Sequence, residues 1–169
     1  EVLAGGGPAD VVELTVQLAR EMLAAAGKPG VDPAPALQDG RAMDRWRRMI
    51  AAQGGDPDAP LPVAEHTHTV VADRDGYVAG LDAMAVGLAA WRLGAGRARK
   101  EDDVQAVAGV ELHAKPGDRI TRGAPLATLH TATPERFERG LAALEGAVTY
   151  SDEPVRPGPV VLGRIAADQ

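Results

Sequence analysis

The stretch VELHAKPGDRITRGAPLATLH, residues 110–130, decides the fold of this chain. Apolar and polar residues alternate over 110–114, which is the period of a half-buried β-strand. The next four residues, Lys-Pro-Gly-Asp at 115–118, predict a type II turn, because proline presets φ at the second position and glycine tolerates a positive φ at the third. A short strand, a second turn and a third strand follow at Ile120, 122–125 and 126–130. The stretch therefore predicts a small, tightly turned β unit.

Four helices are predicted outside this unit, because apolar residues recur there at helical spacing. They cover residues 8–26, 33–52, 83–93 and 134–146. Pro8 and Gly27 are expected at the ends of the first helix, Gly40 is expected to interrupt the second, and Asp82 to cap the third. The apolar stripe of the first helix is wide enough to predict burial on more than one side: Val11, Leu14, Leu18 and Met22, with Val12, Val16, Ala19 and Leu23.

Further strands are predicted on both sides of the β unit. Residues 66–72 and 77–80 have strand-like patterns, and the Asp75-Gly76 turn between them indicates a β-hairpin. A short apolar run near the end of the chain, 160–162, is interpreted as an edge strand. The mixture of helices and strands predicts an α/β fold, which is α+β in detail.

A glycine- and proline-rich stretch over residues 53–62 indicates a linker. We therefore expect two segments, residues 1–60 and residues 61–169. With 45% hydrophobic but only 3% aromatic residues, the core is expected to be aliphatic.

The composition excludes several classes of function. The 169 residues include no cysteine, which excludes disulfides, thiol catalysis and thiolate metal sites. The net charge of −6 is spread along the chain without a basic stripe for nucleic acid, and no apolar run has the length of a membrane span. No basic and apolar leader is visible, so a cytoplasmic protein is the simplest interpretation.

Two glycine-rich motifs resemble phosphate-binding loops. Residues 5–8, Gly-Gly-Gly-Pro, precede a predicted helix, where backbone N–H groups can bind an anion. Pro8 removes one of these donors and no strand precedes the glycines, so a plain loop is favoured. Residues 94–97, Gly-Ala-Gly-Arg, follow a helix, whose C-terminus has the wrong sign for an anion, so a helix cap is favoured. Neither motif is assigned to phosphate.

The titratable residues suggest no catalytic set. His66 and His68 share one face of a predicted strand and could bind zinc with a third ligand, for which Glu65 or Asp73 is available, but a solvent-facing strand is favoured. The other candidates are interpreted as isolated or solvated side chains: His113, His130, the acidic run Glu101-Asp102-Asp103, and the basic side chains Arg41, Arg45, Arg47 and Arg48. We assign no catalytic, phosphate-binding or metal-binding residue, and the substrate-binding residues stay unknown.

The turn at 115–118 also resembles those of biotinyl and lipoyl carrier domains. Such a carrier displays a target lysine at the tip of a hairpin. The lysines of this chain are Lys28, Lys100 and Lys115, and none is expected at such a tip. Covalent attachment is therefore not predicted.

As an ordered set, the motifs resemble the C-terminal part of the thymidine and pyrimidine-nucleoside phosphorylase family. The matching stretches follow one another from about residue 5 to residue 147: Gly40-Arg41-Ala42, MIAAQGGDP at 49–57, LPVA at 61–64, Gly76-Tyr77-Val78, DAMAVG at 82–87, LGAGR at 93–97, Lys100-Glu101-Asp102, Gly109-Val110 and KPGD at 115–118. Two departures are a shortened loop at 58–60 and Gln105, where the family typically has an aspartate.

The resemblance implies both a fold and a function. Residues 1–60 would be the helical end of a larger α/β domain, and residues 61–169 a C-terminal β-sandwich of the barrel-sandwich or hammerhead kind with packed helices. The parent enzyme would be a pentosyltransferase of nucleoside salvage, converting a pyrimidine nucleoside and phosphate into a free base and a (deoxy)ribose 1-phosphate. Phosphate would be its co-substrate, no cofactor is implied in this chain, and a homodimer would form through upstream helices.

The family's catalytic groups lie upstream of this region, so the resemblance implies a fragment that is inactive alone. Two alternatives remain open. One is a freestanding, carrier-like binding module, and the other is the C-terminal part of a nucleotide (AMP) phosphorylase. The choice between thymidine and uridine is also left open.

Overall fold

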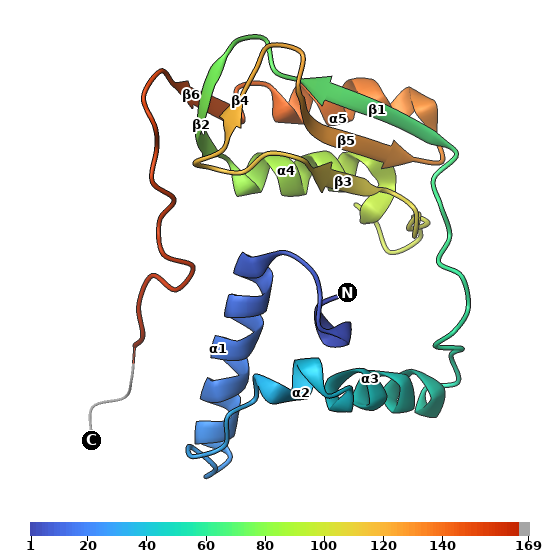
Figure 1. Ribbon diagram of the computed structural model, residues 1–169. Helices are drawn as coiled ribbons and strands as arrows, with labels where there is room; N and C mark the ends of the chain where they lie inside the picture. Colours follow the sequence, from blue (N-terminus) through green and yellow to red (C-terminus); the bar gives the residue numbers. More distant parts are fainter. Residues whose placement is uncertain (166–169) are drawn as a thin grey trace. The chain divides into compact units, whose positions relative to one another are not determined.

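The computed structural model describes residues 1–165 and contains two compact units (Figure 1). One unit holds residues 1–60 together with the tail that starts at Gly158, and the other holds residues 61–157. Helices and strands both contribute, which confirms the mixed α+β class. Within residues 1–165, no helix combines the length and the apolar character that crossing a membrane requires.

The first unit is built from helices: η1 (Val2–Ala4), α1 (Ala9–Ala25), α2 (Pro35–Gln38) and α3 (Arg41–Ala52). α1 follows Pro8 and ends before Gly27, whose φ of 72° favours glycine. Gly40, with a φ of 86°, separates α2 from α3 as predicted. The second helical segment begins at Pro35 rather than at residue 33. The Asp32 carboxylate accepts a hydrogen bond from the Ala34 N–H at 3.3 Å, which holds a turn in front of the helix.

The expected burial of α1 on more than one side is wrong. None of its residues is buried, and the exposed fraction is 54% for Leu18 and 67% for Met22. The helix nevertheless forms over Ala9–Ala25. In the described part of the first unit, however, only Leu37 is a buried apolar side chain, so this unit has little core of its own.

The interpretation of residues 160–162 as an edge strand is also wrong. The described tail contains no strand, and the first unit offers no described strand that could pair with it. The tail instead borders α1, where Arg164 forms an ion pair with Glu21 at 2.9 Å.

The second unit contains two three-stranded antiparallel sheets. In the first sheet, β5 (Pro125–Thr131) lies between β1 (His66–Val71) and β3 (Gly109–Leu112). In the second sheet, β2 (Gly76–Leu81) lies between β4 (Arg119–Ile120) and β6 (Val148–Ser151). All predicted strands of this unit therefore form.

The expected hairpin between residues 66–72 and 77–80 is wrong, because β1 and β2 belong to different sheets. Beyond β1, Ala72 stays paired with the start of β5: its N–H donates to the Ala124 carbonyl, and its carbonyl accepts from the Gly123 N–H, both at 2.8 Å. The Asp75 carboxylate accepts from the Arg122 N–H at 2.7 Å. The Ala72 backbone is thus bound to residues 123 and 124, and the Asp75 side chain to residue 122, in place of hydrogen bonds across a β1–β2 hairpin.

The stretch 110–130 forms the predicted strands and turns. In the 115–118 turn, Gly117 has a φ of 100° and the Asp118 N–H donates to the Lys115 carbonyl at 3.0 Å, which confirms the turn. The second turn closes one residue earlier than expected, with the Ala124 N–H donating to the Thr121 carbonyl at 2.9 Å. β3 and β5 pair with each other, whereas β4 crosses to the other sheet and pairs with β2.

Helices complete the second unit: α4 (Ala83–Ala90), the π-helical turn η2 (Trp91–Ala95), the 3₁₀ turn η3 (Pro134–Arg136) and α5 (Phe137–Leu144). The Asp82 carboxylate caps α4 by accepting from the N–H groups of Met84 (2.8 Å) and Ala85 (3.2 Å). α4 and η2 pack against α5, and a Cβ on Gly140 of α5 would lie only 2.9 Å from Leu93 Cδ2. Both sheets contribute to one aliphatic core cluster: Ala72, Val78, Ala114, Ile120 and Leu126.

Candidate functional site: an arginine pocket

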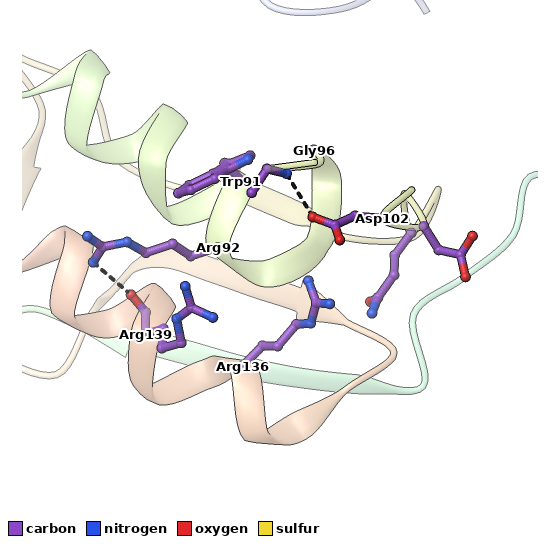
Figure 2. A pocket seen from close by; sticks show the side chains of 9 residues that line it. Trp91, Arg92, Gly96, Asp102, Arg136 and Arg139 are labelled. Atoms are coloured by element: carbon purple, nitrogen blue, oxygen red, sulfur yellow. Dashed lines mark hydrogen bonds between the residues drawn. The ribbon is translucent and has the colours of Figure 1, made fainter. Parts of the chain in front are cut away.

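A surface pocket of about 450 Å³ lies where η2, the loop after it and α5 meet in the second unit (Figure 2). We call it the arginine pocket. Its lining residues are Trp91, Arg92, Gly96, Ala98, Asp102, Asp103, Gln105, Arg136 and Arg139. Charged side chains dominate this lining, so the pocket is suited to a polar ligand.

Three arginines supply the positive charge of the pocket. Arg136 ends η3, directly before α5, and Arg139 lies three residues further on in the first turn of α5, so the two side chains have the spacing of one helix face. Arg92 comes from η2, and its Nη1 donates to the Arg139 carbonyl oxygen at 3.2 Å (Figure 2). None of the ion pairs among residues 1–165 involves these three side chains. Within the described part of the chain, no carboxylate is therefore paired directly with these guanidinium groups.

The acidic run at 101–103 contributes two carboxylates with different roles. Asp102 organises the loop, because its Oδ2 accepts from the N–H groups of Ala98 at 3.1 Å and Arg99 at 2.9 Å. Asp103 is exposed, lines the pocket, and forms no hydrogen bond or ion pair with any residue of the described part of the chain. The run is therefore partly a loop anchor rather than a purely solvated surface.

Gln105 holds the back of the pocket. Its backbone N–H donates to the Gly94 carbonyl at 2.8 Å, and its side-chain oxygen accepts from the Ala132 N–H at 2.9 Å. Its side-chain nitrogen donates to the Thr133 hydroxyl at 2.8 Å. The fully buried Thr131 lies beside it, with its hydroxyl donating to the Leu93 carbonyl at 2.8 Å. Gln105 therefore ties the loop to η2 and to the end of β5 through a donor and an acceptor at once.

Gly94 is required where this loop begins. Its φ is 119°, and an added Cβ would lie 2.8 Å from the Gln105 side chain and 3.1 Å from Arg136 Nη1. Gly94 lies in the last turn of η2, which follows α4, so residues 94–97 end a helix, in agreement with the favoured interpretation. Residues 5–8 likewise follow the short turn η1 rather than a strand.

Three of the four histidines have separate local partners. The His68 ring packs against the Phe137 ring with centroids 5.7 Å apart. His113 Nε2 is 2.7 Å from the Thr128 hydroxyl, and His130 Nε2 is 3.6 Å from the Glu111 carboxylate. Nowhere in residues 1–165 do three or more histidine, aspartate or glutamate side chains form a group that could hold a metal ion. His66 and His68 thus have no third ligand in the described structure.

Two basic side chains of α3 pair with carboxylates. Arg41 forms an ion pair with Asp39 at 2.7 Å, and Arg47 lies 3.4 Å from Asp58. The hydrogen bond from Arg41 also lowers the pKa of the Asp39 carboxyl. Two of the four arginines are therefore already engaged by separate carboxylates.

The arginine pocket is only weakly indicated by the sequence. The signal is the three-residue spacing of Arg136 and Arg139, which is that of one helix face. Arg92 lies in another element, and only the packing of η2 against α5 brings it to the same site. The resemblance singled out Gln105, but not its hydrogen-bonding role.

Comparison with known proteins identifies the family of the second unit. Residues 77–151, which run from β2 to β6, match the family described as the pyrimidine nucleoside phosphorylase C-terminal domain. The chain therefore belongs to the thymidine and pyrimidine-nucleoside phosphorylase family, of which it represents the C-terminal part.

Individual relatives agree with this assignment. The chain is 55% identical to thymidine phosphorylase of Mycobacterium tuberculosis over 165 residues, which is 98% of this chain and 39% of the relative. It is 33% identical to pyrimidine-nucleoside phosphorylase of Staphylococcus aureus over 168 residues, covering 93% of this chain and 39% of that relative. The chain thus spans about two fifths of the length of the relatives it matches.

Proposed function

We propose that this chain is the C-terminal part of an enzyme that cleaves pyrimidine nucleosides with phosphate. The products would be a free pyrimidine base and a (deoxy)ribose 1-phosphate, and phosphate would be a co-substrate rather than a cofactor. The observation that carries this proposal is the 55% identity to a thymidine phosphorylase over 98% of the chain. Identity at this level along the whole chain supports a shared function of the parent proteins.

In this proposal the chain has no catalytic residue and is inactive alone. Phosphorolysis through an oxocarbenium-like transition state requires groups that hold phosphate and polarise the leaving base at one place. The family places these groups upstream of the region that corresponds to this chain. The contribution of the chain would then be to complete and stabilise the enzyme.

The division of the chain follows from the same proposal. Residues 1–60 would be the helical end of a larger α/β domain, and residues 61–169 the C-terminal domain. The exposed apolar stripe of α1 supports this, since such a stripe is expected to pack on the remainder of that domain. Two sheets that share one core cluster support a sandwich of the barrel-sandwich or hammerhead kind.

Thymidine and uridine both remain substrates to test, because the relatives are named as thymidine and as pyrimidine-nucleoside phosphorylases. These names favour a nucleoside over a nucleotide such as AMP. The carrier-like alternative is not favoured either, because a carrier needs a lysine at the tip of a hairpin. Lys115 instead occupies the first position of its turn, where its backbone N–H donates to the Asp118 carboxylate at 2.8 Å. A homodimer formed through upstream helices and a cytoplasmic location belong to the same proposal.

The test is a phosphate-dependent assay of base release from thymidine and uridine. The protein isolated from its source cell is compared with the 169-residue chain at equal molar concentration. We expect base release by the native protein only when phosphate is present, and none by the chain. A native protein without phosphate-dependent release would overturn the proposed reaction, and release by the chain would overturn its inactivity.

A further inference from the structure

We propose that the arginine pocket binds the phosphoryl group of a small phosphorylated sugar. Arg136 and Arg139 would contact the phosphoryl oxygens, and Asp103 would accept hydrogen bonds from sugar hydroxyl groups. This goes beyond the proposed function, because phosphorolysis is assigned to groups outside this chain. The pocket would be a second place at which the protein recognises a phosphate ester.

The arginine pocket differs in charge from the rest of the chain. The chain as a whole has a net charge of −6, yet three guanidinium groups line this one pocket. Two carboxylates, Asp102 and Asp103, line it as well. Three guanidinium groups against two carboxylates leave an excess of one positive charge in the lining. Such an excess attracts an anion to a site in an otherwise acidic molecule.

The three arginines of the pocket come from elements that pack against one another. Figure 2 shows Arg136 and Arg139 rising from the same helical segment, with Arg136 extending toward the side on which Asp102 lies. The hydrogen bond from Arg92 to the Arg139 carbonyl joins η2 to α5 at the pocket. Guanidinium groups are planar and donate pairs of parallel hydrogen bonds, which matches the oxygens of a phosphoryl group.

The rest of the lining argues for a sugar attached to the phosphoryl group. The volume of about 450 Å³ is within the range of small-molecule sites and exceeds what a bare phosphate needs. The Trp91 side chain, which is 37% exposed, supplies an apolar wall, and Asp103 supplies acceptor oxygens without a partner of their own among residues 1–165. A polyhydroxylated ring uses both kinds of surface.

The pocket is held in place before a ligand arrives. Gln105 ties its loop to Gly94, Ala132 and Thr133, and the Asp102 carboxylate closes the turn at residues 98–102. Little ordering is therefore required on binding, which favours affinity for a small ligand.

The test measures binding to the 169-residue chain by calorimetry and by NMR shift perturbation, at low and at moderate salt. The probes are ribose 5-phosphate, inorganic phosphate and unphosphorylated ribose. We expect ribose 5-phosphate to bind more tightly than inorganic phosphate, and ribose not to bind. The double variant Arg136→Gln/Arg139→Gln should weaken ribose 5-phosphate binding about tenfold or more. The matched control, Arg156→Gln, removes an exposed arginine of the same unit outside the pocket and should leave the affinity unchanged.

Two outcomes would overturn the proposal: no binding of ribose 5-phosphate to the wild-type chain, or equal weakening by the double variant and by the control. The Arg136 and Arg139 side chains form no hydrogen bond or ion pair with other described residues, so both replacements should leave the fold intact. An unchanged NMR spectrum away from the pocket verifies this. The readout is binding without turnover, so its result is independent of the phosphorolysis assay.

Discussion

Gly117 allows the tight turn that redirects the chain between the two sheets of the second unit. Its φ of 100° turns the chain from β3 toward β4, which pairs in the other sheet. An added Cβ would lie 3.0 Å from Pro157 Cδ and 3.2 Å from the Val155 carbonyl oxygen. Backbone strain and close approach thus act together at this position.

Gly117→Val should therefore lower the free energy of unfolding by about 1–3 kcal/mol. Gly109→Ala is the control, because Gly109 has an ordinary φ and no atom within 4 Å of an added Cβ. Urea denaturation of both variants measures the difference. An unfolding midpoint of Gly117→Val equal to that of wild type would contradict the strained turn.

Tyr150 provides a prediction about pH. Burial raises the pKa of its phenol above the ordinary value, and the nearby carboxylate of Asp73 raises it further. Because the folded state favours the neutral phenol, the resulting contribution to stability is complete below the unfolded pKa. It is lost as the pH rises through the folded pKa.

Tyr77→Phe leaves Tyr150 as the only tyrosine, so that its ionisation can be followed by ultraviolet absorbance. We expect a titration midpoint above that of the urea-unfolded chain. Adding Asp73→Asn should lower the midpoint toward the ordinary value. A midpoint equal in the folded and unfolded chains would show that the phenol is not perturbed.

At the scale of elements, the local signals were sufficient for the helices and strands but not for how the strands pair. The Asp82 cap, Gly40 and Gly117 act on neighbouring residues, so the sequence predicts their effects directly. The pairing of β1 with β5 joins segments about sixty residues apart, and a turn signal at Asp75-Gly76 carries no information about it. The hairpin prediction failed for that reason.

The arginine pocket shows the same limit. Arg136 at the end of η3 and Arg139 on α5 follow helical spacing, but Arg92, Gln105 and the loop at 98–103 reach the site only through tertiary packing. The two glycine motifs, in contrast, could be interpreted from neighbouring residues alone, which indicated a loop at 5–8 and a helix end at 94–97.

The apolar stripe of α1 gives a prediction for a whole element. Because the stripe is exposed in this chain, truncating it should cost little stability, whereas truncating the buried Leu37 should leave a cavity. We expect Leu37→Ala to lower the free energy of unfolding by about 2–4 kcal/mol, and Leu18→Ala by less than about 1 kcal/mol. Comparable losses measured by thermal unfolding would show that α1 is buried after all.

For the whole molecule, the sequence predicted the fold class and the family because many weak motifs occur in one order. Each motif mostly marks a turn, a cap or a close packing contact, as Gly94 and Asp82 show, and their order reflects the fold. Substrate preference is a property of the larger enzyme that we propose, so this part of the chain carries no signal for it.

That the chain is part of a larger phosphorylase is the central claim, and the intact mass of the native protein in its source cell tests it most directly. We expect a mass well above 17.5 kDa, with the residues of this chain preceded by a longer segment. A native mass equal to that of this chain would show that it is not part of a larger phosphorylase, and a binding module with its own partner would then be the better description.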